Sequence, residues 1–187
     1  MSTKHTLAVT LGLLATTVSF STQAKETQIV AAESAVTAEF SQIGVPVIAR
    51  FRSIAGKVNF DPKKPAEASA HFDIDTSSLD VGDELYNGEV RKRDWFNSAQ
   101  FPKATLDAQG LTAIGNDHYT TTATLTFKGR VKKITIPVSV HPDILNLVFD
   151  GSVPVSRKEF SLGDPGWNEV LEDMVLVNFH IAIPAPH

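Results

Sequence analysis

Residues that could carry acid–base or metal chemistry are few and scattered. The only cluster is His71, Asp73 and Asp75, where alternate residues of a predicted strand share one face and stand about 7 Å apart. Two carboxylates at that spacing could bind a cation or exchange protons. The same positions suit a solvated outer strand face, which is the interpretation we favour, and an enzyme built on this cluster stays as an alternative. The other histidines of the central chain show no metal-ligand spacing, and they stand at His118, His141 and His180.

Several classes of enzyme are excluded by the motifs that the chain lacks. It has no cysteine, which removes disulfides, thiolate metal sites and cysteine nucleophiles together. It has no Gly-x-Ser-x-Gly elbow, no phosphate-binding loop and no dinucleotide fingerprint. We therefore expect a protein that is not an enzyme and that holds no metal.

The overall composition is that of a single folded domain. The chain has 187 residues, of which 42% are hydrophobic and 20% charged, with a formal net charge of −4. This length favours one domain, and the apolar fraction argues against disorder. An acidic balance without clustered Lys and Arg indicates that nucleic acid is not a partner.

The N-terminal segment has the pattern of a secretory signal peptide. A basic start at Lys4 precedes an uncharged run, and small residues up to Ala24 come before the charged pair Lys25 and Glu26. We expect cleavage after Ala24, which leaves a mature domain of 25–187 with 16 basic and 21 acidic residues, a net charge of −5. The predicted location is the periplasm or the cell exterior.

The chain that follows alternates apolar and polar residues with a period of two, which is typical of strands with one buried face. Hairpin turn residues separate these segments, for example Lys128-Gly129. About eight strands at this spacing predict an all-β fold, an antiparallel barrel or a sandwich. The expected strands are 34–40, 47–60, 68–75, 106–114, 119–127, 134–140, 145–153 and 174–183.

One long connection interrupts the strands. Residues 78–98 are rich in charge, and their apolar residues are loosely spaced, so we expect a short helical excursion at about 80–98. Connections this long in a compact domain are often functional. Trp95, Phe96, Phe101 and Trp167 fall in or beside such irregular stretches rather than in mid-strand.

These aromatic residues either plug the ends of a barrel or form the mouth of an apolar cavity. A closed barrel of about eight strands is wide enough to fill with side chains or to hold one ligand. The positions on the apolar face of the predicted strands include no ionisable residue, which favours an apolar ligand. The predicted lining consists of Phe40, Phe51, Phe60, Phe72, Trp95, Phe96, Phe101, Leu125, Phe127, Ile136, Val138, Leu147, Phe149, Phe160 and Phe179.

Five sequence motifs point to a family. They are 56–62 (GKVNFDP), 74–82 (IDTSSLDVG), 94–106 (DWFNSAQFPKATL), 123–130 (ATLTFKGR) and 157–163 (RKEFSLG). In this order and spacing the chain resembles the YceI-like family of secreted polyisoprenoid-binding proteins, over about Ser34 to Ile183. The resemblance implies an eight-stranded antiparallel barrel of lipocalin-like shape with one long isoprenoid chain in its interior, and it carries over no catalytic residue.

The resemblance also sets the expected ligand and partners. A polyprenyl phosphate or a prenylquinone would be the bound lipid in place of any cofactor, and Arg91 or Arg93 near the mouth could contact its head group. The chain departs from the commoner pattern at 85–92, and its 42–47 opening with Trp167 resembles a branch associated with di-haem cytochromes b, which would favour a prenylquinone.

The alternative function is a stress or interaction protein without a ligand. Its barrel would be filled by its own side chains, and its surface would dock a membrane redox partner such as a cytochrome b. Transient contact with a membrane or a membrane cytochrome is expected under either hypothesis, and the sequence leaves a homodimer open.

Overall fold

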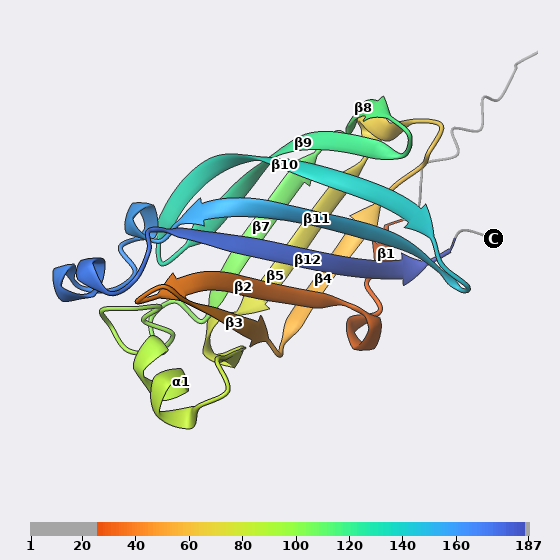
Figure 1. Ribbon diagram of the computed structural model, residues 1–187. Coiled ribbons are helices and arrows are strands. Elements are labelled where there is room, and N and C mark those ends of the chain that lie inside the picture. The colour runs from red at the N-terminus through yellow and green to blue at the C-terminus, as the bar shows by residue number, and fades with distance from the viewer. Residues whose placement is uncertain (1–25, 186–187) are drawn as a thin grey trace, which may run out of the picture.

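A computed structural model describes residues 26–185, so the predicted signal peptide, 1–24, lies outside the described residues. The described chain is an all-β domain with one short α-helix, as the sequence predicts (Figure 1). Its longer strands are β2 (Ala35–Gln42), β3 (Val45–Phe51), β4 (Ile54–Asn59), β5 (Ser69–Asp75), β7 (Lys103–Gln109), β9 (His118–Phe127), β10 (Arg130–Pro142), β11 (Asn146–Ser156) and β12 (Met174–Pro184). The shorter elements are β1 (Thr27–Gln28), β6 (Leu79–Asp80), β8 (Thr112–Gly115), α1 (Glu84–Val90) and the 3-10 turns η1 (Ala31–Glu33), η2 (Pro65–Glu67), η3 (Thr76–Ser78), η4 (Lys158–Phe160) and η5 (Pro165–Glu169).

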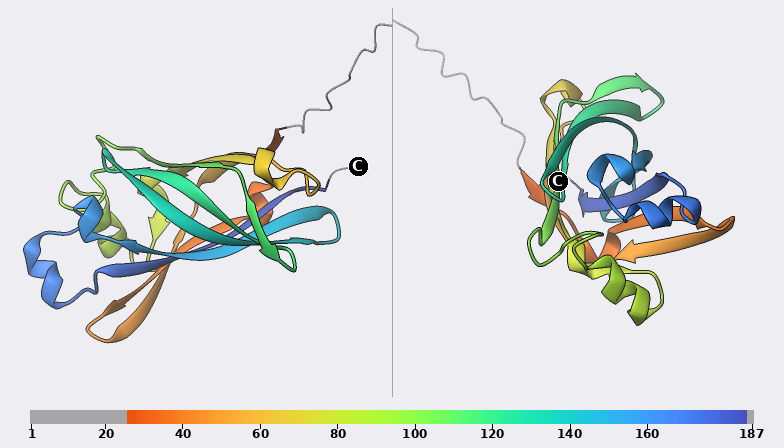
Figure 2. Two further views of the ribbon diagram at one scale, coloured as in Figure 1. Left: turned by 90° about the horizontal axis from the view of Figure 1, so that it is seen from above. Right: turned by 90° about the vertical axis from the view of Figure 1, so that its left-hand side faces the viewer.

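The strands form one antiparallel sheet that curls round on itself (Figure 2). Its hydrogen-bonded order is β1-β4-β5-β7-β9-β10-β11-β12-β2-β3-β6, with β8 pairing β9. β4 is the second strand in this order and β3 is the second from last. In the chain the two strands are joined directly by Arg52 and Ser53. The bent segment 45–59 therefore pairs with β2 through β3 and with β5 through β4. This double pairing curls the sheet into a barrel-like shape.

The strand count differs from the expected eight at four places. Residues 47–60 bend into β3 and β4, and 106–114 divide into β7 and β8, because Gly110 turns the chain with a φ of +71°. Two short strands, β1 and β6, were not predicted. The first lies along β4, and the backbone N–H of Val30 just after it donates to the carbonyl of Ala182 at 2.8 Å, which bridges β4 to β12.

The predicted helical excursion is confirmed as α1 and the turns that follow it. Asp83 caps the helix, since its carboxylate accepts hydrogen bonds from the backbone N–H groups of Leu85 at 2.8 Å and Tyr86 at 3.4 Å. The helix lies at the same end of the barrel as η4 and η5 (Figure 1). No helix within residues 26–185 has the length and apolar character needed to cross a bilayer.

Buried residues form two apolar clusters. The larger runs along the barrel interior and includes Ile136, Phe149 and Ile181. The smaller fills the α1 end, where Leu79, Trp95, Phe96, Phe160 and Leu162 pack together. The interior is thus apolar over its length, and the excursion around α1 supplies aromatic packing at one end.

Gly151 is needed where β10, β11 and β12 approach closely. A Cβ atom at this position would overlap the ring of Phe179 and the carbonyl oxygen of Pro137. We expect Gly151→Ala to lower the free energy of unfolding by about 1–3 kcal/mol, the usual cost of overpacking. Gly88→Ala is the matched control, because nothing lies within 4 Å of its added methyl group on α1, and the change should raise stability by about 0.5–1 kcal/mol. Urea unfolding of both variants tests this, and equal effects would contradict it.

Candidate functional site

A long apolar cavity runs inside the curled sheet. Its volume is about 490 Å³, within the range of small-molecule sites. Side chains from β2, β3, β4, β5, β7, β9, β10, β11 and β12 form its wall, because alternate residues of each strand face inward. On β5, for example, Phe72 and Ile74 line the cavity, whereas His71 and Asp73 do not.

Most of the predicted lining lies along this wall. Several of the aromatic members also contact one another: Phe60 meets Phe149 edge-on with centroids 5.4 Å apart, and Phe96 meets Phe127 at 4.8 Å. The predicted residues that line the cavity are Phe40, Phe51, Phe60, Phe72, Trp95, Phe96, Leu125, Phe127, Ile136, Val138, Phe149 and Phe179.

Three predicted lining residues lie elsewhere, which corrects the prediction at those positions. Phe160 is 1% exposed and packs into the small cluster behind the cavity, because η4 rather than a strand carries it. Phe101 follows the excursion and lies close to Gly129 in the β9–β10 turn. Leu147 packs against the larger cluster near the opposite end of β11, outside the cavity lining.

The two arginines predicted to contact a head group do not line the cavity either. Arg91 is already engaged, since its Nε donates to the carbonyl of Ser77 at 2.9 Å and its Nη1 to Glu84 at 3.1 Å. Arg93 is exposed and outside the lining. Arg91 is the C-cap residue of α1 and Arg93 lies in the turn that follows, positions that residue spacing alone does not reveal.

The arginine that does line the cavity is Arg157, which the sequence reasoning missed as a site residue. It is 4% exposed, and its guanidinium donates to the carbonyls of Glu172 at 2.9 Å and Leu162 at 3.0 Å. It also donates to Asn168 Oδ1 at 2.8 Å and to the carbonyl of Leu171 at 3.1 Å. Arg157 therefore connects residues 162–172 to the end of β11 and supports the cavity wall at that end.

Polar groups lie at the two ends of the cavity rather than in its middle. At the α1 end the lining includes Gln42, Tyr86 and three carboxylates, and at the far end it includes two amides and two hydroxyl groups. The carboxylates are Asp83, Glu89 and Glu172, and the far-end groups are Asn59, Ser69, Gln109 and Thr121. The cavity thus suits a long apolar molecule with a polar group at one end.

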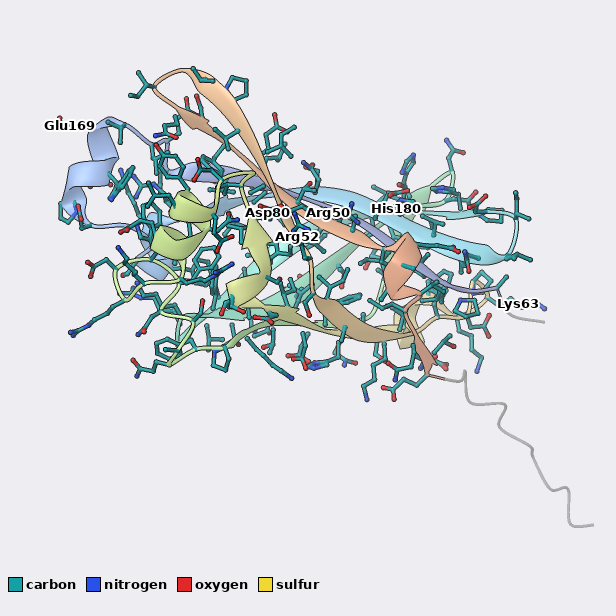
Figure 3. All side chains as sticks on the ribbon, turned by 90° about the horizontal axis from the view of Figure 1, so that it is seen from below. Arg50, Arg52, Lys63, Asp80, Glu169 and His180 are labelled. Atoms are coloured by element: carbon teal, nitrogen blue, oxygen red, sulfur yellow. The ribbon has the colours of Figure 1, made fainter. Side chains whose placement is uncertain are left out.

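Asp80 fastens the α1 segment to the sheet. Its carboxylate accepts hydrogen bonds from the Asn87 amide at 2.9 Å, from Nε of Arg52 at 2.9 Å and from the Gly82 N–H at 3.0 Å. These contacts, that with Asn87 foremost, lower the pKa of Asp80 to about 2. The contact to Arg52 joins β6 to the end of β3, and Figure 3 shows the two side chains together beside α1.

The shifted pKa of Asp80 predicts an acid-sensitive attachment. A depressed carboxylate pKa contributes stability that is fully present above about pH 4 and is lost as the pH falls through about 2. We expect the urea concentration at the unfolding midpoint to decrease as the pH is lowered from 4 to 2. The decrease should be smaller in Asp80→Asn. Equal slopes for the wild type and the variant would contradict this contribution.

The His71 cluster lies on the outer surface as an ion-pair ladder. His71 Nδ1 is 2.7 Å from Asp107 Oδ1, and Asp73 accepts from Lys103 Nζ at 2.7 Å, a contact that lowers the pKa of Asp73. Asp75 turns away to cap η3 and accepts from the N–H of Ser77. The two carboxylates therefore do not converge on one point, and the solvated-face interpretation fits this geometry.

Comparison with known proteins gives the same architecture. The crystal structure of Burkholderia cenocepacia BcnA superposes with a TM-score of 0.79 and 35% sequence identity, covering 82% of this chain and 98% of that one. A polyisoprenoid binding domain from Saccharophagus degradans, implicated in plant cell wall breakdown, has a TM-score of 0.68 at 21% identity and covers 88% and 99% of the two chains.

Curated protein sequences also include proteins that are similar to this chain. A UPF0312 protein of Shewanella denitrificans is 30% identical over 137 residues, 71% of either chain. The family model described as the YceI-like domain matches residues 28–183, nearly all of the described sheet. The chain belongs to the YceI-like domain family.

Proposed function

We propose that this protein binds an isoprenoid lipid in the cavity and carries it without catalysing a reaction. The observation that carries the proposal is the continuous apolar wall inside the barrel, with polar groups only at its ends. The structural neighbour from Saccharophagus degradans, described as a polyisoprenoid binding domain, supports this ligand class. Membership of the YceI-like family supports it too.

Burial of the chain supplies the binding free energy. An isoprenoid of about 40 carbons would bury several hundred Å² of apolar surface, and at roughly 25 cal/mol per Å² this contributes several kcal/mol. The lipid would be a polyprenyl phosphate or a prenylquinone.

The site of action that we propose is the periplasm or the cell exterior, on the strength of the N-terminal pattern. Exchange of the lipid would take place at the α1 end in transient contact with a membrane. Exposed apolar side chains lie at that end, as they also do in the β10–β11 turn: Ile43 is 75% exposed, Val45 is 61% exposed and Leu85 is 81% exposed. Such a collar around the entrance of a lipid cavity would lie against acyl chains.

A direct binding experiment tests the function. The protein is titrated in detergent-free buffer with a prenylquinone and, separately, with a polyprenyl phosphate of the same chain length. Saturable uptake of one lipid per chain is expected for at least one of them. Absence of saturable uptake of either would contradict lipid binding and favour the ligand-free interaction protein.

A further inference from the structure

Three short segments that are far apart in the sequence carry most of the basic residues of this acidic chain. Residues 91–94, 128–133 and 157–161 contain nine basic and two acidic residues, a net charge of +7. The whole domain 25–187 has 16 basic and 21 acidic residues. The positive charge is therefore concentrated in these segments, and the rest of the domain is strongly acidic.

The fold brings the three segments together. In the β9–β10 turn, Lys128 Nζ donates to the carbonyls of Asp94 at 3.1 Å and Ser161 at 2.6 Å, which joins all three. Arg130 Nη1 donates to the carbonyl of Glu159 at 3.3 Å, which makes a second connection between the turn and η4. The segments thus form one continuous surface, which we call the basic rim.

The basic rim adjoins the α1 end of the cavity. Each of its segments is next in the chain to a residue that lines the cavity: Trp95 follows the first, Phe127 precedes the second and Leu162 follows the third. Consecutive Cα atoms are only about 3.8 Å apart. The cations therefore stand beside the end of the cavity at which we place lipid exchange.

Several cations of the basic rim are not neutralised by a carboxylate. Arg93 and Arg130 are exposed and form no ion pair with any residue that the structure describes. Lys133 and Lys158 are exposed as well. The rim cations that do form ion pairs are Arg91 with Glu84, Lys92 with Glu89 and Lys132 with Glu159. Positive charge thus remains available to an external anion.

An exposed apolar side chain stands among these cations. Val131 follows Arg130 at the start of β10 and is 61% exposed. Cations interspersed with apolar side chains suit the surface of an anionic membrane, where charge attracts the protein and the apolar groups enter the interface. A hydrated polyanion, such as an acidic protein tail, would use the charge but would leave the valine in water. The composition of the rim therefore favours a lipid surface.

The carboxylates of the same end belong to other segments. Asp83 and Glu84 stand at the start of α1, and Glu169 lies on η5. An anionic surface attracts the basic rim and repels these two segments. The barrel would therefore approach such a surface with the β9–β10 turn foremost.

We propose that the basic rim docks the barrel on an anionic phospholipid surface, with the β9–β10 turn at the interface. The isoprenoid is then exchanged where the α1 end meets the membrane. This inference rests on the proposed lipid-binding function, to which it adds the charge of the membrane and the face of the protein that contacts it.

Vesicle binding tests the role of charge. The probes are vesicles of phosphatidylcholine alone and vesicles that contain about one-third phosphatidylglycerol, which is anionic. We expect at least tenfold tighter binding to the anionic vesicles in about 0.05 M salt, and loss of this difference in about 0.5 M salt. Equal binding to the two kinds of vesicle, or no binding to the anionic ones, would overturn the proposal.

The double variant Arg93→Gln, Arg130→Gln removes two exposed cations of the rim. We expect at least tenfold weaker binding to the anionic vesicles, because each cation near such a surface supplies about fivefold, or about 1 kcal/mol. Lys63→Gln, Lys64→Gln is the matched control, since it changes the net charge equally at the opposite end of the barrel, where Figure 3 shows Lys63. Equal losses in both variants would show attraction by net charge alone and contradict a docking face.

Single-cysteine labelling tests the orientation, because the chain has no cysteine of its own. Val131→Cys, labelled with a fluorophore sensitive to polarity, should shift to shorter emission wavelengths on the anionic vesicles. Ile144→Cys is the control, because Ile144 is 93% exposed in the β10–β11 turn at the far end (Figure 1). A shift of the Ile144→Cys label without one at Val131→Cys would show that the opposite end docks and that the proposal is wrong.

The outcomes separate membrane docking from lipid binding. Uptake of a prenylquinone by a protein that shows no preference for anionic vesicles would overturn the docking and leave the proposed function intact. Docking without uptake of any isoprenoid would support the rim and contradict the function. Binding to polyglutamate without binding to anionic vesicles would assign the rim to an acidic protein partner and overturn membrane docking.

Discussion

Replacing Phe160 by alanine is expected to lower the free energy of unfolding by about 3–5 kcal/mol. The side chain is 1% exposed, packs with Leu79, Phe96 and Leu162, and stands 5.8 Å from the ring of Phe127. Its removal leaves a void that this tightly packed end cannot fill. Urea unfolding measures the loss, and a cost below about 1 kcal/mol would show that this end is not packed as described.

Leu125→Ala is the informative counterpart. Leu125 lines the cavity and is only half-buried, so truncation enlarges a space that already exists. We expect a cost of less than about 2 kcal/mol, under the range for a packed core, together with altered lipid binding. A loss as large as that of Phe160→Ala would indicate a barrel filled by its own side chains, which is the alternative function.

Filling the cavity is expected to have the largest effect on binding. Ala108 on β7 lines the interior and pairs across strands with Ala70 and Ala123. A tryptophan at this position would occupy space that the proposed lipid chain requires, so Ala108→Trp should weaken isoprenoid binding at least tenfold. The thermal midpoint is measured alongside to show that the variant folds.

The matched control places the same ring outside the barrel. Thr122 on β9 is exposed and does not line the cavity, so Thr122→Trp should bind lipid as the wild type does. Equal losses in both variants would indicate a general effect of the added tryptophan. Unchanged binding in a folded Ala108→Trp protein would place the lipid outside the cavity.

The strands were predictable from the sequence because their pattern is local. The alternation along 68–75 and 119–127 reports which face is buried, and it placed Phe72, Leu125 and Phe127 on the side that the cavity occupies. The sheet order and the bend between β3 and β4 depend on long-range pairing, which periodicity does not report. For the same reason 106–114 was read as one strand, although Gly110 divides it.

The polar part of the site was much less predictable. A charged segment near a cavity mouth suggests a head-group contact for Arg91 and Arg93, but Arg91 instead binds the carbonyl of Ser77 and Glu84, and neither arginine lines the cavity. Arg157 lay in a sequence motif, yet no spacing rule separates a buried arginine from an exposed one.

The central claim is that the cavity holds one isoprenoid lipid, and the mass of the native protein tests it most directly. The full chain is expressed in a bacterial host, purified without detergent, incubated in separate samples with ubiquinone-9 and with a polyprenyl phosphate, and measured by native mass spectrometry. We expect the protein mass plus that of one isoprenoid molecule, with Ala108→Trp at its bare mass. A bare wild-type mass after incubation, or the same adduct on wild type and Ala108→Trp, would contradict the account.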